Sequence, residues 1–320
     1  MRLPASIKAF GITRALDYLE RDPDANLPRL MEWVDKYTGE RLGPPYRELF
    51  HRAMTDPENN WHRLIKSMYT DIDSRVLKKI FENFVIHGGL LEWPERSAAG
   101  RLNQADAPWS VIIDPSFPCT LGCAGCGATI YGVRPVMEFD SMDEVVERRK
   151  SQGCHLFIVS GGDPLAKEQE AIALCNKHSD CVFAAFTPPQ SITEQLCVDL
   201  LRVCNLFPAI RVDVDPRDAR RAAELLRRYR LPFGVACGCT ADNADQVATK
   251  TYYDTVIGVG AKFCWFFSCP AYGPSRPPTP EQLEAIHRRV KAFRKTEPLL
   301  TLDFWDGPGI SEAAPQGGKT

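Results

Sequence analysis

Apolar residues in the first third of the chain recur at three- and four-residue spacing, the period of an amphipathic helix. One such face consists of Val76, Leu77, Ile80 and Phe84. The same spacing predicts helices over residues 26–37, 46–55, 61–67 and 74–85. A polar stretch with Gly, Asn and Pro at 96–108 is typical of a connector. The pattern therefore predicts a helical N-terminal segment over residues 1–107, whose helices could close the substrate side of the domain that follows.

The pattern changes after residue 108, where short β-like runs alternate with helical periods. The runs lie at 109–114, 155–160, 181–187, 209–215, 232–237 and 262–268. Capping boxes at Ser141/Glu144 and Ser191/Glu194 predict two helix starts. Asp215 and Thr279 are each followed by proline, which is favoured at the first position of a helix, and so they predict two further helix starts.

Six βα units in series predict an α/β fold with a parallel sheet and helices outside it. Such a sheet either opens as a doubly wound layer or curls into a barrel. The reactive site lies at the C-terminal strand ends in both cases. We expect this domain over residues 108–296 and a C-terminal extension over 297–320. The small, polar residues from Ser311 onward predict a disordered end.

Composition narrows the function classes. The chain has 320 residues, 44% of them hydrophobic and 25% charged, which is ordinary for a globular protein with a sizeable core. A net charge of −2 with both signs interspersed gives no basic face for nucleic acid. No run of 18 apolar residues predicts a membrane span, and the N-terminus lacks the apolar core of a signal peptide. We therefore expect a cytoplasmic protein, in which twelve cysteines do not predict a disulfide framework.

Three cysteines form the most informative motif. Residues 118–127, PCTLGCAGCG, place Cys119, Cys123 and Cys126 on the loop after the first predicted strand. Cysteine thiolates are the ligands of iron–sulfur clusters. Three cysteines leave one iron of a four-iron cubane open to a substrate or cofactor. The alternatives are three incidental cysteines or a zinc site, which needs a fourth ligand such as Cys154 or His155 approaching in space.

The CxxxCxxC spacing after a first strand, with SGGDP after the second, resembles the radical S-adenosylmethionine (SAM) superfamily. SGGDP is similar to the GGE motif of that family, with Asp in place of Glu. The segments DPENNWHRLIK, IFENFVIHGGL, LPFGV and GAKFCWFF further resemble one bacterial subgroup whose members carry a helical N-terminal segment. The resemblance covers residues 20–307.

The resemblance implies a (βα)6 partial TIM-type barrel in which the cysteine triad holds a [4Fe–4S] cluster. It also implies that the second motif binds the SAM amino group through a backbone carbonyl and the carboxylate, and that Asp213 occupies an acidic position that helps to hold SAM. The motif residues are Ser160, Gly161, Gly162, Asp163 and Pro164.

The activity that the resemblance implies is reductive cleavage of SAM. A reduced flavodoxin- or ferredoxin-type donor supplies the electron, and the resulting 5′-deoxyadenosyl radical modifies a small-molecule substrate, so that the enzyme is a transferase or lyase. One alternative is cleavage to a 3-amino-3-carboxypropyl radical, with transfer to a thiol-bound soft substrate such as arsenite. Another is a non-catalytic Fe–S or zinc protein.

The chain departs from the subgroup at three places. Gly127 replaces an aromatic residue after the third cysteine, and Arg211 replaces a serine on the fourth strand. The sequence also ends soon after residues 303–305, where the subgroup continues into a cysteine-bearing extension. We therefore expect no auxiliary cluster of that type.

Four further cysteines fall near the predicted C-terminal strand ends: Cys237, Cys239, Cys264 and Cys269. They are either apolar core residues or a soft-ligand site for a second cluster or a thiophilic substrate. Arg211, Asp213 and Asp215 alternate along the fourth strand, where inward charges need partners such as SAM, a polar substrate or helix arginines. We expect the other cysteines to be core residues, and His155 and His178 to be structural.

Overall fold

The computed structural model describes residues 14–23, 25–29, 32, 44–87, 110–114, 137–212, 216–268, 276–304 and 310–313. The cysteine triad, Asp213, Asp215 and Cys269 lie outside the described residues, as does the 96–108 connector. No helix in the described ranges is both long enough and apolar enough to cross a lipid bilayer.

Helices occupy the N-terminal part of the chain, as predicted. They are α3 (Pro44–Thr55), α4 (Asn60–Asp71) and α5 (Ser74–Phe81), followed by a π-helical turn (Glu82–His87). Asn59 and Asp73 cap α4 and α5 by accepting hydrogen bonds from the backbone N–H groups of Trp61 and Arg75. Within the predicted 26–37 helix, the structure describes residues 26–29 and 32, which are helical.

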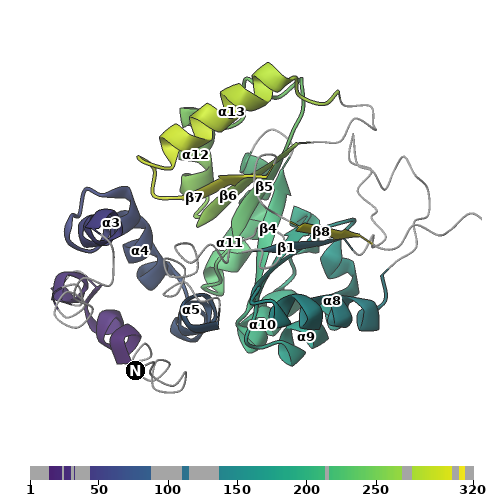
Figure 1. The fold of residues 1–320 in the computed structure, drawn as a ribbon, viewed down its shortest axis with the longest axis horizontal. Coiled ribbons are helices and arrows are strands. Elements are labelled where there is room, and N and C mark those ends of the chain that lie inside the picture. Colours follow the sequence, from purple (N-terminus) through teal and green to yellow (C-terminus); the bar gives the residue numbers. More distant parts are fainter. Residues whose placement is uncertain are drawn as a thin grey trace, which may run out of the picture.

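The strands that the structure describes form one sheet, in the order β7-β6-β5-β4-β3-β2-β1-β8. Every pair of neighbouring strands in it is parallel. From β1 to β7 the spatial order follows the chain, so this sheet has no reversal point of the doubly wound type. It curls into a partial barrel (Figure 1). The strands are β1 (Val111–Asp114), β2 (Leu156–Val159), β3 (Val182–Thr187), β4 (Leu206–Val212), β5 (Gly234–Cys239), β6 (Phe263–Ser268), β7 (Leu300–Asp303) and β8 (Ile310–Ala313).

The six predicted strands are confirmed as β1–β6, with ends shifted by a few residues. The sequence pattern missed β7 and β8. Both lie within residues 297–320, so part of the predicted C-terminal extension belongs to the barrel sheet. Ser311, where the polar composition predicted the start of disorder, pairs with Ile112 of β1.

Helices connect successive strands and cover the outer face of the sheet (Figure 1). They are α8 (Phe139–Ser151), α9 (Glu168–Lys177), α10 (Glu194–Val203), α11 (Arg220–Arg228), α12 (Lys250–Gly258) and α13 (Pro280–Phe293). The Thr279 cap of α13 is confirmed, with Pro280 at the first position. The Gln282 side chain in turn accepts a hydrogen bond from the backbone N–H of Thr279.

The two predicted capping boxes are wrong. Glu138 precedes α8 and makes no side-chain cap bond. Thr193 caps α10 by accepting from the N–H of Leu196. Ser191 instead donates its hydroxyl to Asp163, because the chain first forms a short 3₁₀ turn there.

The sheet has two apolar faces, since successive side chains of a strand point to opposite sides. The outer face packs against the helices in the main core. The inner face of the curl carries a second cluster, made of Ile158, Ala184, Phe186, Ala209, Ala236 and Trp265. Strand parity therefore decides whether a residue faces the helices or the interior of the barrel.

The N-terminal helices pack against the strand starts. The N–H of Asp73 donates to the carbonyl of Arg230, four residues before β5, at 2.7 Å. Lys262, directly before β6, donates to Ser67 on α4 at 3.0 Å. These contacts place α4 and α5 at the edge opposite the C-terminal strand ends. The expectation that the N-terminal helices close the substrate side is therefore wrong for α4 and α5.

Candidate functional site

The ends of β1 and β2 lie side by side at the C-terminal edge of the sheet. Ile113 pairs with Val159, and the N–H of Ser160 donates to the carbonyl of Ile113 at 2.8 Å. β1 ends at Asp114, five residues before Cys119 in sequence. The chain therefore leaves β1 towards the cysteine triad from a position beside Ser160.

Two consecutive glycines turn the chain after β2. Gly161 has φ 76° and Gly162 has φ 68°, in the left-handed region that residues with a side chain rarely adopt. Ser160 and Gly161 are half-buried, whereas the following residues up to Leu165 are buried. Because glycine has no side chain, the peptide groups of this turn can approach a ligand closely.

Asp163 is a buried carboxylate that joins three segments. One oxygen, Oδ1, accepts from the N–H of Leu165 at 3.1 Å and from the hydroxyl of Thr187, at the end of β3, at 3.0 Å. The other oxygen, Oδ2, accepts from the hydroxyl of Ser191. A carboxylate has about four acceptor sites, so three bonds leave about one for a ligand. The direct role of Asp163 in binding SAM stays a prediction, while the structure gives it a clear role in holding the turn.

Arg211 lies on the inner face of the sheet, half-buried. It shares strand parity with Ala209, and it forms a row across three strands with Ala236 and Trp265. The prediction that Arg211 points inward is therefore supported by its register. Asp213, two positions further on, follows the end of β4 directly and lies outside the described residues.

Aromatic side chains gather on the inner face at β6 and just after β7, a feature that the sequence interpretation missed. Ring centroids of Phe267 and Phe304 lie 4.7 Å apart and nearly parallel, and those of Trp265 and Phe304 lie 5.5 Å apart. Phe263 lies over Gly234, where a Cβ atom would be 2.1 Å from the ring. Alternate aromatic residues in FCWFFS were the pattern that could have predicted this face.

Comparisons with known proteins address the fold. No protein-family model matches the chain, and no curated protein sequence does. Among solved structures, SuiB from Streptococcus suis bound to S-adenosylmethionine matches with TM-score 0.52 and 14% identity, over 65% of this chain and 54% of SuiB. Another SuiB structure matches with TM-score 0.51 and 12% identity, over 85% of this chain and 61% of SuiB. The chain shares its fold, a partial barrel of parallel strands, with SuiB. A radical SAM methyltransferase from Sphaerobacter thermophilus aligns at TM-score 0.44 and 12% identity, over 62% of this chain and 67% of that protein.

The matched part of the chain covers between about half and about three fifths of the length of SuiB. The likeness confirms the partial TIM-type barrel that the motifs implied. In this partial barrel the SGGDP turn follows β2 at the C-terminal edge, as the sequence predicted.

The described cysteines of β5 and β6 face away from the barrel interior. Cys237, Cys239 and Cys264 are fully buried in the core between the sheet and the helices. Their strand neighbours Ala236 and Trp265 occupy the inner face instead. β5 and β6 do end at the edge where we expected these thiols to meet a ligand. However, the alternation of side chains along each strand directs the three thiols towards the helices. Burial raises the pKa of Cys264 well above its usual value, with nearby Cys237 adding to the effect, which favours a neutral core thiol.

The zinc alternative for the triad required a nearby fourth ligand. Cys154 and His155 directly precede β2, at the opposite edge of the sheet from Asp114. Cys154 is buried, and burial raises the pKa of its thiol to about 11. Neither residue lies at the edge from which the chain leaves β1 towards the triad. The predicted core placement of Cys175 and Cys197 is confirmed, since both are buried in the main core.

Replacing Cys264 with serine should lower the free energy of unfolding and leave unchanged the SAM cleavage that is proposed below. A hydroxyl in this apolar layer costs about 1–3 kcal/mol if it finds no hydrogen-bond partner. Urea unfolding measures the loss, and SAM turnover per folded protein should stay unchanged. Cys204→Ser is the matched control with a smaller expected loss, because Cys204 is only partly buried and its thiol already contacts the carbonyl of Leu201. Loss of SAM turnover in Cys264→Ser at unchanged stability would show that this thiol serves the reaction.

Proposed function

We propose that this chain is a radical SAM enzyme that cleaves S-adenosylmethionine reductively and uses the product radical to modify a small molecule. The 160–164 turn supports this proposal most directly. It has two left-handed glycines and lies beside the end of β1, next to the segment that leads into CxxxCxxC. The partial barrel that carries it is shared with SuiB, whose structure was determined with S-adenosylmethionine bound.

The residues fit the two cofactors that the proposal requires. Cys119, Cys123 and Cys126 provide three thiolates, which hold three irons of a [4Fe–4S] cluster and leave one iron open. The glycine turn offers backbone carbonyls, and Asp163 retains about one acceptor site for the SAM amino group. When bound, the cluster supplies one electron to the SAM sulfonium, and a reduced flavodoxin- or ferredoxin-type protein replenishes it.

The remaining inner-face residues orient the substrate and exclude water. Trp265, Phe267 and Phe304 form an apolar wall that shields a reactive radical from solvent. Arg211 carries a fixed positive charge on the same inner face. A substrate with a flat apolar part and an anionic group matches this face. We propose a transferase or lyase acting in the cytoplasm.

Anaerobic reconstitution tests the proposal. We expect about four irons per chain and a change in the electron paramagnetic resonance spectrum of the reduced cluster when SAM is added. A non-catalytic Fe–S protein would assemble its cluster but show no spectral response to SAM. Tightly bound zinc without iron after anaerobic purification would contradict the cluster assignment.

A further inference from the structure

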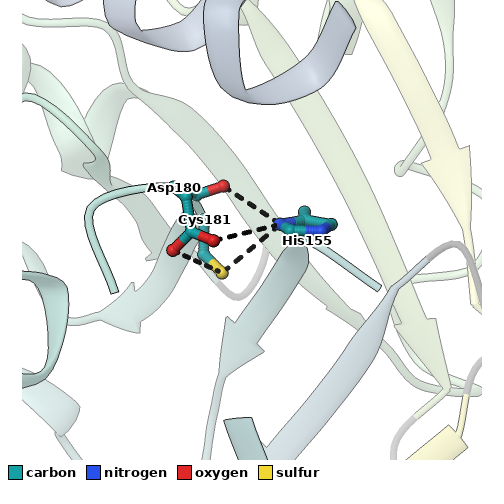
Figure 2. Close-up of side chains that lie close together, drawn as sticks. All are labelled: His155, Asp180 and Cys181. Atoms are coloured by element: carbon teal, nitrogen blue, oxygen red, sulfur yellow. Dashed lines mark hydrogen bonds and ion pairs between the residues drawn. The ribbon is translucent and has the colours of Figure 1, made fainter. Parts of the chain in front are cut away.

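Three side chains that can ligate a metal meet at the N-terminal edge of the sheet, away from the SAM turn. Figure 2 shows His155, which precedes β2, facing Asp180 and Cys181, which precede β3. One ligand atom from each lies within 4.8 Å of the others. The site is separated from Ser160 by the length of β2, roughly 16 Å at the usual strand rise. A metal bound here is therefore distinct from the cluster at the opposite edge.

The three side chains lie near enough to one another to contact one ion. His155 Nδ1 lies 3.8 Å from Cys181 Sγ and 3.9 Å from Asp180 Oδ2. Cys181 Sγ lies 3.9 Å from Asp180 Oδ1. Zinc bonds of about 2.0–2.3 Å at tetrahedral angles separate ligand atoms by about 3.3–3.6 Å. The nitrogen of His155 and the sulfur of Cys181 would need to approach each other by a few tenths of an ångström. Rotation of the Asp180 side chain would have to present one oxygen to both, since Oδ2 now faces His155 and Oδ1 faces Cys181.

Buried amides fix the backbone that carries the thiol. The carbonyl of Cys181 accepts from the side-chain amide of Asn83 at 2.7 Å and from that of Asn205 at 3.1 Å. Both asparagines are fully buried. The N–H of Val182 donates to the carbonyl of His155 at 2.8 Å, which locks the two strand starts together. Such support around the ligands holds their geometry in metal sites.

Charge and exposure also suit a divalent ion. The Cys181 thiol is buried, whereas the side chains of His155 and Asp180 are 14% and 33% exposed, so a water molecule can reach a fourth position. A thiolate and a carboxylate together offset the charge of a divalent cation. Lys150 lies 3.2 Å from Asp180 Oδ1 and leaves Oδ2 directed at His155.

Without metal, the same residues are held by hydrogen bonds. His155 Nδ1 lies 3.1 Å from the carbonyl oxygen of Asp180. Burial, reinforced by the neighbouring Asp180 carboxylate, raises the pKa of the Cys181 thiol, so an incoming metal must displace its proton. Metal binding would thus replace hydrogen bonds among these three residues with bonds to the metal.

We propose that His155, Asp180 and Cys181 bind one zinc ion, with water as the fourth ligand. The ligand set of one nitrogen, one sulfur and one carboxylate oxygen is of the type that zinc accepts. The ion would crosslink the segments that precede β2 and β3 and so stabilise the pairing of these two strands. It would take no part in the reaction at the opposite edge of the barrel.

Zinc-edge X-ray absorption on the full-length protein, with its iron–sulfur cluster reconstituted and one equivalent of Zn²⁺ added, tests the proposal. We expect one sulfur at about 2.3 Å and nitrogen or oxygen neighbours at about 2.0 Å. Zinc bound instead to the cysteine triad would show three sulfurs, and that result would overturn the proposal.

Variants give an independent test, with zinc affinity measured by competition with a chelator. Cys181→Ser should remove the sulfur neighbour. His155→Gln, which retains a polar side chain at a half-buried position, should lower zinc affinity by at least about 10-fold, the smallest loss expected even for an outer-shell change. Cys197→Ser, another fully buried thiol, is the matched control and should bind zinc like the unaltered protein. Equal zinc affinity in His155→Gln and in the control would also overturn the proposal.

Discussion

Cys126→Ala should abolish both the cluster absorbance and all cleavage of SAM. Two thiolates cannot hold a four-iron cluster that depends on three, and without it no electron reaches the sulfonium. Iron content, the visible spectrum and the mass spectrum of SAM after anaerobic reduction measure the effect. We expect a complete loss of both the cluster and SAM cleavage.

Cys197→Ser is the control for this experiment, because Cys197 is a buried core thiol on α10 far in sequence from the triad. It should retain iron and SAM cleavage per folded molecule. Full iron content and unchanged cleavage in Cys126→Ala would show that Cys126 is not a ligand, and that the CxxxCxxC spacing is incidental.

Asp163→Ala should weaken SAM binding and lower stability while iron content stays intact. The substitution leaves the buried N–H of Leu165 and the hydroxyls of Thr187 and Ser191 without their acceptor. Unsatisfied buried donors cost about 1–3 kcal/mol each, so a total loss of about 2–5 kcal/mol is expected after partial relaxation. The glycine turn loses its anchor at the same time, and its carbonyls are then less well placed for SAM. Urea unfolding and SAM titration calorimetry measure the two effects.

Asp163→Asn is the matched variant. Its amide oxygen can still accept from Leu165 and Thr187, whereas its NH₂ group cannot accept from Ser191. Its loss of stability should therefore be the smaller of the two. SAM affinity equal to that of the unaltered protein in both variants would show that the turn does not bind SAM.

Much of the fold was predictable because it follows from local patterns. The six core strands and their helices were recognisable from short apolar runs and helical periods. β7 and β8 were not, since four-residue strands such as Ile310–Ala313 gain their stability from pairing with distant partners. The packing of α4 and α5 against the strand starts depends likewise on tertiary contacts made by Arg230 and Lys262. No periodicity in the sequence encodes those contacts.

A sequence motif predicted the position of the glycine turn. The sequence could not predict which face of the sheet the cysteine side chains occupy. The SGGDP motif placed two glycines directly after the second predicted strand, where the structure has a turn with both glycines at positive φ. Proximity in sequence to the C-terminal strand ends could not show that Cys237 and Cys264 face the helices, because a shift of one residue reverses the face. The meeting of His155 with Cys181 depends on the register between β2 and β3, which only the folded sheet fixes.

Anaerobic incubation of the reconstituted protein with SAM and a strong reductant, followed by mass spectrometry of SAM fragments, tests whether the protein cleaves SAM reductively. We expect SAM-derived fragments, such as 5′-deoxyadenosine with methionine, that appear only when the reductant and an intact cysteine triad are both present. Intact SAM in a sample whose four-iron cluster is fully assembled and reduced would contradict this expectation.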